Sequence, residues 1–91
     1  MKFQETFKAL SDPTRRNILE ILKPSRMTAG EIVSKFDVTG ATISRHLSVL
    51  KEAGLVSDTK EGKYVYYELN TSVMEEAMQW LANIIERDAN K

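Results

Sequence analysis

The chain has 91 residues, with 13 Lys and Arg against 13 Asp and Glu and no cysteine. This length predicts one small domain, and the lack of cysteine excludes disulfides, thiolate metal sites and cysteine nucleophiles. Zero net charge argues against a nonspecific polyanion binder, although residues 1–70 carry 11 cationic against 9 anionic side chains. Because no basic-then-apolar leader and no bilayer-length apolar run is present, we expect a cytoplasmic protein.

An apolar repeat opens the chain. Phe3, Phe7 and Leu10 are spaced four and three residues apart, which predicts a short helix over about residues 2–10. A helix of this length is only marginally stable by itself, so we expect it to pack against another part of the protein.

A second helix is predicted to begin at Ser11-Asp12-Pro13. A capping residue there precedes a proline in the first turn, where the missing N–H costs nothing. Pro24 ends this helix. Arg15 and Arg16 lie near its beginning and are either phosphate contacts or ordinary solvated charges.

Two capped helices and a short connection predict a helix-turn-helix over about residues 28–53. Thr28 and Glu31 have the spacing of a capping box, which begins the first helix of the motif. Thr39 is a good N-cap for the second, and Gly54 suits the left-handed conformation that ends a helix. Because the connection is short, the helices cross steeply and the second one projects from the body.

The second helix of this motif has two different faces. Ile43, Leu47 and Leu50 form one apolar stripe. The opposite face carries small and hydroxyl side chains with one long cation: Ala41, Thr42, Ser44, Arg45, Ser48 and Glu52. In an isolated helix this face would indicate a solvated surface, but the neighbouring elements favour contact with another macromolecule.

The period of the sequence then changes from helical to alternating. Leu55–Thr59 and Lys63–Leu69 are predicted as strands, with a turn over 60–62 between them. This hairpin must rest on the helices, since two strands alone are marginally stable. Its polar tip forms a wing, over about residues 55–69 in all, and Lys60 and Lys63 are either phosphate contacts or solubilising charges.

The last helix is predicted over about residues 71–87 and has two adjacent apolar stripes. The stripes are Val73, Ala77, Trp80 and Ile84, and Met74, Met78, Leu81 and Ile85. Either the domain buries the whole helix, or the helix forms a dimer interface together with the first helix. Since 91 residues offer little to cover both stripes, we expect a homodimer. The expected interface residues are Phe3, Phe7, Val73, Ala77, Trp80, Leu81 and Ile84.

Three separated stretches resemble the ArsR-type family of winged-helix repressors: Ala9–Leu19 (ALSDPTRRNIL), Ile43–Val56 (ISRHLSVLKEAGLV) and Gly62–Leu69 (GKYVYYEL). They agree with the family in order and spacing over nearly the whole chain. The resemblance implies a single winged helix-turn-helix domain over residues 1–91, mainly α with a small β-hairpin in the order α-α-α-α-β-β-α. It further implies a homodimer, paired through the first and last helices, that represses transcription from a palindromic double-stranded DNA operator.

The resemblance also suggests which residues meet DNA. In the family, the major groove is approached by the positions of Ala41, Thr42, Ser44, Arg45 and His46, and the wing at 60–63 reaches adjacent backbone. Arg45 is the best candidate to read guanine, and Ser48 lies on the same face. The helix terminus at Thr39 and Gly40 suits a phosphate. Further candidate phosphate contacts are Arg15, Arg16, Lys35, Lys60 and Lys63.

His46 is the sole histidine and lies in the predicted reading helix, where it either contacts a base or forms a hydrogen bond within the domain. Transition-metal sites generally need imidazole or thiolate ligands, so we interpret Glu75, Glu76, Glu86 and Asp88 as solvated charges. We therefore expect neither a metal nor another cofactor. The chain resembles the metal-independent subgroup typified by sporulation-delay autorepressors, which implies control through sequestration by a membrane-bound protein.

Two other function classes compete with DNA binding. A winged-helix protein-interaction module, with weak or no DNA binding, is favoured slightly by the zero net charge. An enzyme is disfavoured, because the sequence shows no Ser/His/Asp set, no phosphate-cradling glycine loop and no metal cluster. Arg45 among small hydroxyl neighbours favours DNA over both.

Overall fold

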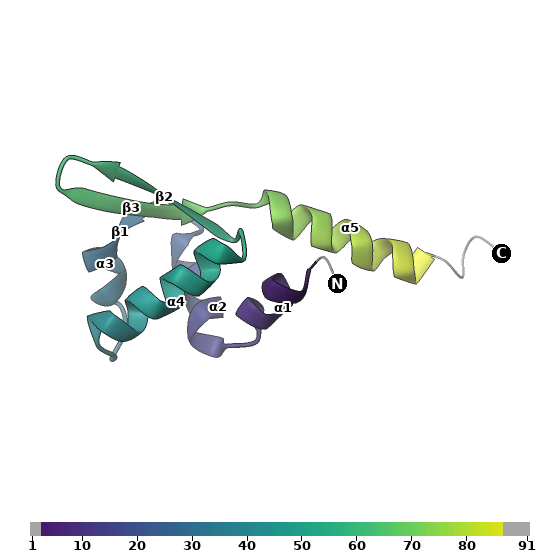
Figure 1. Ribbon diagram of the computed structural model, residues 1–91, viewed down its shortest axis with the longest axis horizontal. Helices are drawn as coiled ribbons and strands as arrows, with labels where there is room; N and C mark the ends of the chain where they lie inside the picture. The colour runs from purple at the N-terminus through teal and green to yellow at the C-terminus, as the bar shows by residue number, and fades with distance from the viewer. Residues whose placement is uncertain (1–2, 87–91) are drawn as a thin grey trace.

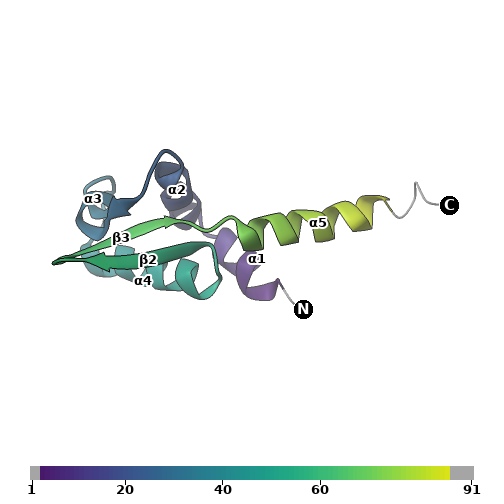
Figure 2. The same ribbon diagram turned by 90° about the horizontal axis from the view of Figure 1, so that it is seen from above.

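The computed structural model describes residues 3–86, and the expected helix ends at residues 2 and 87, like Asp88, lie outside this range. The elements within it are α1 (Gln4–Leu10), α2 (Pro13–Leu22), β1 (Met27–Thr28), α3 (Ala29–Val33), α4 (Gly40–Glu52), β2 (Val56–Glu61), β3 (Tyr64–Leu69) and α5 (Ser72–Glu86). Helices α1 to α4 form the body, the hairpin lies along one side of it, and α5 extends away from it (Figures 1 and 2). The predicted helix–helix–helix-turn-helix–hairpin–helix order is therefore confirmed.

Side-chain caps define where the helices of the body begin. The Asp12 carboxylate accepts the backbone N–H groups of Thr14 at 2.8 Å and Arg15 at 3.1 Å, with Pro13 in the first turn of α2. These bonds satisfy donors that a helix N-terminus otherwise leaves unpaired. The predicted start of the second helix is confirmed.

The helix-turn-helix is built from the two predicted caps. Thr28 Oγ1 accepts the N–H of Glu31 at 3.1 Å, and the Glu31 carboxylate accepts the N–H of Thr28 at 2.8 Å, which completes the capping box of α3. Thr39 Oγ1 accepts the N–H of Thr42 at 3.2 Å and begins α4. Each helix start thus depends on residues no more than three positions apart.

The sheet contains one more strand than the sequence predicted. The strand order is β1-β3-β2, and the short β1 pairs antiparallel with β3 through Met27 opposite Tyr67. A strand of two residues has no periodicity to detect, and only pairing with β3 makes it a strand. Residues 27 and 28 thereby join the hairpin to the start of α3.

The hairpin turn is tighter than the predicted turn over residues 60–62. Lys60 pairs with Val65 and Glu61 with Tyr64, so β2 extends farther and only Gly62 and Lys63 turn the chain. Gly62 has φ 62°, which the first position of a two-residue turn of this kind requires. The prediction placed the right residues at the tip but ended the first strand too early.

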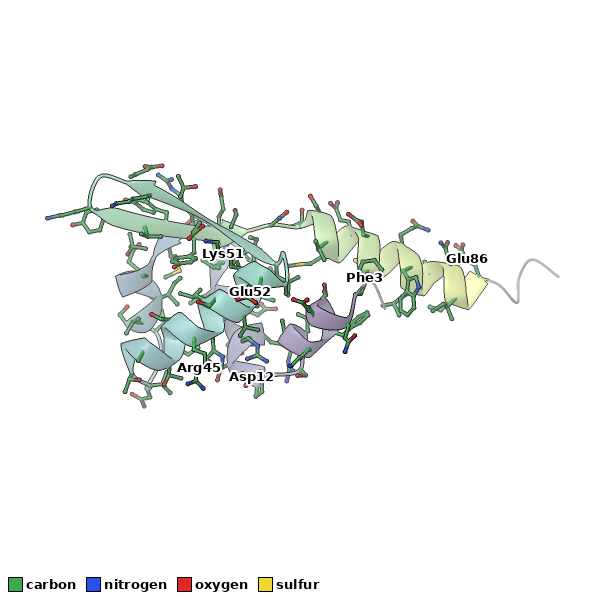
Figure 3. The ribbon with its side chains drawn as sticks, in the orientation of Figure 1. Phe3, Asp12, Arg45, Lys51, Glu52 and Glu86 are labelled. Carbon is green, nitrogen blue, oxygen red and sulfur yellow. The ribbon has the colours of Figure 1, made fainter. Side chains whose placement is uncertain are left out.

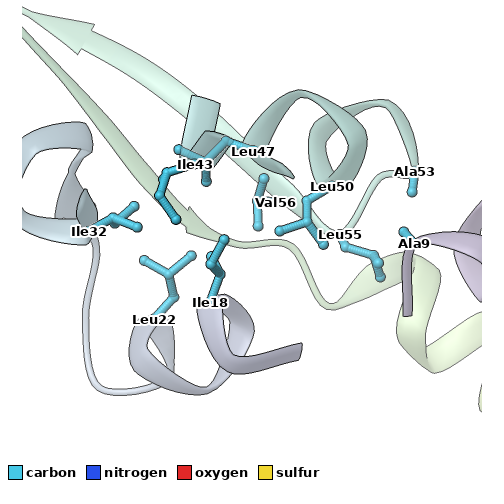
Figure 4. Close-up of a cluster of buried hydrophobic side chains, with 10 residues drawn as sticks. All are labelled: Ala9, Ile18, Leu22, Ile32, Ile43, Leu47, Leu50, Ala53, Leu55 and Val56. Carbon is cyan, nitrogen blue, oxygen red and sulfur yellow. The ribbon is translucent and has the colours of Figure 1, made fainter. Parts of the chain in front are cut away.

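The core lies between the helices of the body and the base of the hairpin (Figure 4). Its buried side chains are Ala9, Ile18, Leu22, Ile32, Ile43, Leu47, Leu50, Ala53, Leu55 and Val56. The predicted apolar stripe of α4 is confirmed, since Ile43 and Leu50 are fully buried and Leu47 is 2% exposed. This packing holds one face of α4 in the body and leaves the opposite face outside.

Helix α5 is largely uncovered. Among its residues only Ala77 is buried, whereas Met78 and Ile85 are 68% and 76% exposed. The alternative in which the domain buries the whole last helix is therefore wrong. Among residues 3–86, no helix has the combined length and apolar character needed to cross a bilayer.

Candidate nucleic-acid interface

The outer face of α4 is a continuous exposed surface of small, hydroxyl and charged side chains. Its exposed residues include Thr39, Gly40, Ala41, Thr42, Ser44, Arg45, Ser48 and Glu52. Arg45 points away from the hairpin, on the outer side of the helix (Figure 3). The structure therefore brings the predicted reading residues together on one face, because the buried stripe of α4 fixes the rotation of the helix about its axis.

Arg45 has no intramolecular partner in the part of the chain that the structure describes. It lines a shallow depression together with Ala41, Thr42 and His46. A guanidinium presents five N–H donors in a planar fork, which matches the two acceptors at the major-groove edge of guanine. The small neighbours leave room for another molecule to approach this group.

The N-terminus of α4 adds main-chain donors to this face. Thr39 Oγ1 and Thr42 Oγ1 lie 3.0 Å apart and share a hydrogen bond, and Thr39 Oγ1 also accepts the N–H of Thr42, so both hydroxyls already have a partner within the chain. The N–H groups of Gly40 and Ala41 are in the first turn, where a helix offers no acceptor. Together with the helix dipole, such donors favour an anion.

Arg15 and Arg16, two candidate phosphate contacts, donate to the end of α1 instead of projecting freely. Arg15 Nε donates to the carbonyl of Ala9 at 2.8 Å, and Arg16 Nη1 donates to that of Leu10 at 2.7 Å. Arg15 Nη1 also lies 3.2 Å from Nδ1 of His46. Of the two alternatives for His46, the structure shows the hydrogen bond within the domain.

Asp12 lies in the same region and is held in its charged form. The backbone N–H of Arg15 contributes most to lowering the pKa of the Asp12 carboxyl below its ordinary value of 3.8, and burial opposes this effect. The N–H of Thr14 and the positive charge of the Arg15 guanidinium lower the pKa further. A carboxylate that accepts backbone N–H groups is stabilised relative to its protonated form.

The wing is attached to the body by a pair that sequence analysis missed. Arg26 donates to both carboxylate oxygens of Glu61, at 2.6 and 3.0 Å, and its guanidinium carbon lies 4.0 Å from the centre of the Tyr66 ring. This hydrogen-bonded ion pair raises the pKa of Arg26 and lowers that of Glu61. The partners are 35 positions apart, and no local pattern in the sequence links them.

The cationic side chains at the wing tip remain outward. Lys60 and Lys63 are exposed, and Lys63 Nζ lies 5.5 Å from the centre of the Tyr64 ring. Lys35, another candidate phosphate contact, is exposed just after α3. These groups present positive charge to a ligand beyond the body.

The residues expected at a dimer interface divide into two groups. Phe3, Phe7 and Trp80 form an aromatic cluster within one chain, with ring centres 5.9 to 6.4 Å apart. Phe3 and Ala77 are buried and Phe7 and Val73 are half-buried, whereas Trp80, Leu81 and Ile84 are 37%, 43% and 45% exposed. Met78 and Ile85, on the second apolar stripe, are more exposed still and were not among the expected interface residues.

Among residues 3–86, no group of three or more His, Asp or Glu side chains is arranged to hold a metal ion. Glu75 and Glu86 are exposed on α5. A capped helix-turn-helix whose second helix exposes its outer face, followed by a hairpin with a cationic tip, defines the winged helix-turn-helix class of nucleic-acid-binding domains.

Similarity to known proteins supports this assignment. A family model described as a helix-turn-helix domain matches residues 10–59. The transcriptional repressor SdpR of Bacillus subtilis (strain 168) is 46% identical over 84 residues, which cover 92% of this chain and 93% of that protein. The arsenical resistance operon repressor of Escherichia coli (strain K12) is 35% identical over 83 residues, covering 90% and 68% respectively.

A crystal structure of an ArsR family transcriptional regulator, RHA00566, superposes with a TM-score of 0.89 at 26% identity, covering 99% of this chain and 93% of that one. The chain belongs to the ArsR-type family of winged helix-turn-helix transcriptional repressors. It is a DNA-binding transcriptional regulator, as the resemblance in its sequence implied.

Proposed function

We propose that this protein acts as a homodimer that binds a palindromic operator in double-stranded DNA and represses transcription. The uncovered outer face of α4, on which Arg45 has no intramolecular partner among the described residues, is the main support for this proposal. Two copies would present their α4 helices about 34 Å apart, to successive major grooves. Because DNA is the target, the proposal places the protein in the cytoplasm.

The roles of the outer-face residues follow from their chemistry. Arg45 would donate to O6 and N7 of a guanine, and Ala41 or the methyl group of Thr42 would touch a thymine methyl. Ser44 and Ser48 would serve base edges or phosphates with their hydroxyls. The N–H groups of Gly40 and Ala41, next to the Thr39 cap, would bind a phosphate.

Positive groups beside α4 would contact the DNA backbone. Lys60, Lys63 and Lys35 are exposed and would bind phosphates without reading sequence. We leave Arg15 and Arg16 out of this set, because their guanidinium groups donate to carbonyls of α1. We also leave out His46, because its Nδ1 lies 3.2 Å from Arg15 Nη1 within the domain.

The second subunit would cover the exposed apolar side chains of α5. Leu81 and Ile84 project from this helix next to the aromatic cluster that joins it to α1. Burying such a patch against a symmetric copy removes apolar surface from water. A membrane-bound protein that sequesters the dimer would relieve repression; the resemblance to the metal-independent subgroup supports this part of the proposal.

Selection of duplexes from a random-sequence pool tests the proposal without knowledge of the operator. We expect enrichment of an inverted repeat with half-site centres about 10 base pairs apart. Affinity for the enriched duplex should fall steeply as salt rises, because each phosphate contact releases counterions. A pool that shows no enrichment at low or moderate salt contradicts the proposal and favours the protein-interaction module.

A further inference from the structure

Three helices meet at the guanidinium group of Arg15. Its Nε donates to the carbonyl of Ala9 at 2.8 Å and its Nη2 to that of Lys8 at 3.2 Å, both near the end of α1. Its Nη1 lies 3.2 Å from Nδ1 of His46, in the middle of α4. Arg15 itself stands in the first turn of α2, where Asp12 accepts its backbone N–H at 3.1 Å.

The chemistry of the two side chains assigns the direction of the Arg15–His46 bond. A guanidinium has donors only, so Nδ1 of His46 must accept, and the neutral ring then carries its proton on Nε2. This bond selects one tautomer and one orientation of the imidazole. His46 directly follows Arg45, so the bond also restrains α4 at the level of its exposed arginine.

We infer that Arg15 is a positioning residue that couples α1 to the reading helix α4 through His46, and that it does not serve as a phosphate contact. Helix α1 carries Phe7, whose ring packs against Trp80 of α5. The Arg15 junction therefore lies between the helices of the proposed dimer interface and Arg45. This inference rests on the proposed function, because its consequence is the placement of two α4 helices on an operator.

Charge-retaining and charge-removing variants separate the two possible roles of Arg15. Arg15→Lys keeps a cation for phosphate but lacks the planar fork that reaches three acceptors. We expect Arg15→Lys and Arg15→Gln to lose operator affinity alike, on the order of tenfold, with an unchanged slope of log affinity against log salt. If Arg15→Lys retains full affinity, or if Arg15→Gln reduces the slope by about 0.9, Arg15 is a phosphate contact and the inference is wrong.

Arg16→Gln is the matched control. Arg16 is the next residue of α2, has the same charge and also donates to α1, through the Leu10 carbonyl at 2.7 Å. Among the described residues it has no bond to α4. We expect Arg16→Gln to change operator affinity less than threefold, and a loss equal to that of Arg15→Gln would show that the bond to His46 has no special role.

Variants of His46 test whether the coupling runs through Nδ1. The amide oxygen of an asparagine can take the place of Nδ1, so His46→Asn should keep near-normal affinity while His46→Ala loses it. In the double variant Arg15→Gln with His46→Ala, the loss should be no greater than in Arg15→Gln alone, because the two changes remove one interaction. Additive losses, or equal losses in His46→Asn and His46→Ala, would overturn the inference.

One measurement needs no variant and does not depend on DNA. Nitrogen NMR of wild-type His46 should show that the neutral imidazole has an unprotonated Nδ1 and a protonated Nε2. A protonated Nδ1 in the neutral ring would exclude the bond and overturn the inference even if the variants fail to fold. If the wild-type protein selects no duplex at all, the proposed function fails, whereas duplex binding with an insensitive Arg15 refutes only the coupling.

Discussion

Arg45 differs from the other arginines within residues 3–86 in what surrounds it. Arg15 and Arg16 donate to carbonyl groups of α1, and Arg26 donates to the Glu61 carboxylate. Arg45 is exposed on α4 without such a partner in the described structure. A side chain that already has its hydrogen bonds must break them to bind a ligand, so Arg45 is the arginine best able to gain from a base contact.

Replacing Arg45 tests its role as a reader. We expect Arg45→Ala to weaken operator binding by about 1–3 kcal/mol and to relax specificity, while Lys63→Ala weakens binding to all duplexes alike. Titration of each variant with the selected duplex and a scrambled duplex measures both effects. Equal losses on the two duplexes for Arg45→Ala would show that this residue does not read sequence.

Asp12 links the stability of α2 to pH. Its pKa is lowered in the folded protein, mostly by the backbone N–H of Arg15. The ionised carboxylate of Asp12 is therefore more stable in the folded protein than in the unfolded chain. The resulting stabilisation is present above the unfolded pKa, near 3.8, and is lost as the pH falls through the folded value. Acid should therefore weaken the start of α2.

Two replacements of Asp12 separate the cap from its titration. At neutral pH, Asp12→Ala should cost about 1 kcal/mol of unfolding free energy, and Asp12→Asn should cost less because Asn is also a good cap. Below pH 4 the wild-type protein should lose more stability than Asp12→Asn, since Glu31 and Glu61 titrate in both. Urea unfolding across this pH range measures the difference, and parallel pH curves would contradict the assignment.

At the junction between α4 and β2, the close approach of α5 limits which residue can occupy position 54. Gly54 has φ 76°, and a Cβ added there would lie 2.8 Å from Cγ2 of Val73, next to the start of α5. The backbone N–H of Leu55 then donates to the carbonyl of Leu50 at 2.9 Å, which closes the helix. This position needs glycine both for its left-handed conformation and for the close approach of α5.

Gly54→Ala should therefore destabilise the fold by about 1–3 kcal/mol, from backbone strain with an added clash. Gly30→Ala is the matched control, because Gly30 lies in α3 without a positive φ, and a Cβ added there would meet open space. We expect that change to be neutral or to stabilise by up to about 1 kcal/mol. Similar losses in the two variants, by urea unfolding, would show that the α4–β2 junction has no special requirement.

At the scale of the whole molecule, α5 is an arm that extends from the body and contacts it through the aromatic cluster, Met74 and the buried Ala77. Trp80 lies against Phe3 and Phe7, while Leu81, Ile84 and other apolar side chains remain exposed. An exposed apolar patch on a small protein commonly marks an interaction surface. A second subunit would cover this patch and would also set the distance between the two reading helices.

A charge placed on this patch should separate the subunits. We expect Leu81→Glu to weaken dimerisation by about 2 kcal/mol or more, and to weaken operator binding because each half-site then binds alone. Asn83→Asp is the matched control, since it adds the same charge to α5. It also keeps an acceptor for Gln79 Nε2, which donates to Asn83 Oδ1 at 3.0 Å in the wild-type protein. Sedimentation equilibrium measures the effect, and a wild-type monomer or an unaffected Leu81→Glu dimer would contradict the proposed interface.

Local features of the sequence were enough to predict the helices of the body and the face that α4 exposes. Helix caps such as Thr39 act within three or four positions, and the stripe of Ile43, Leu47 and Leu50 follows from helical periodicity alone. The hairpin turn also depends on neighbouring residues, and its predicted position over 60–62 overlaps the observed turn at Gly62 and Lys63. The expected reading residues other than His46 consequently lie together on the outer face of α4.

Only the tertiary structure decided the contacts between distant parts of the chain. Arg15 reaches His46 across 31 positions and Arg26 reaches Glu61 across 35. Likewise β1 exists only because β3 pairs with it. Such contacts depend on how the core brings the helices and the hairpin together, and the sequence has no local signal for them. The sequence therefore determined which residues α4 exposes, and the packing of α1, α2 and the sheet decided which cations stay available to a ligand.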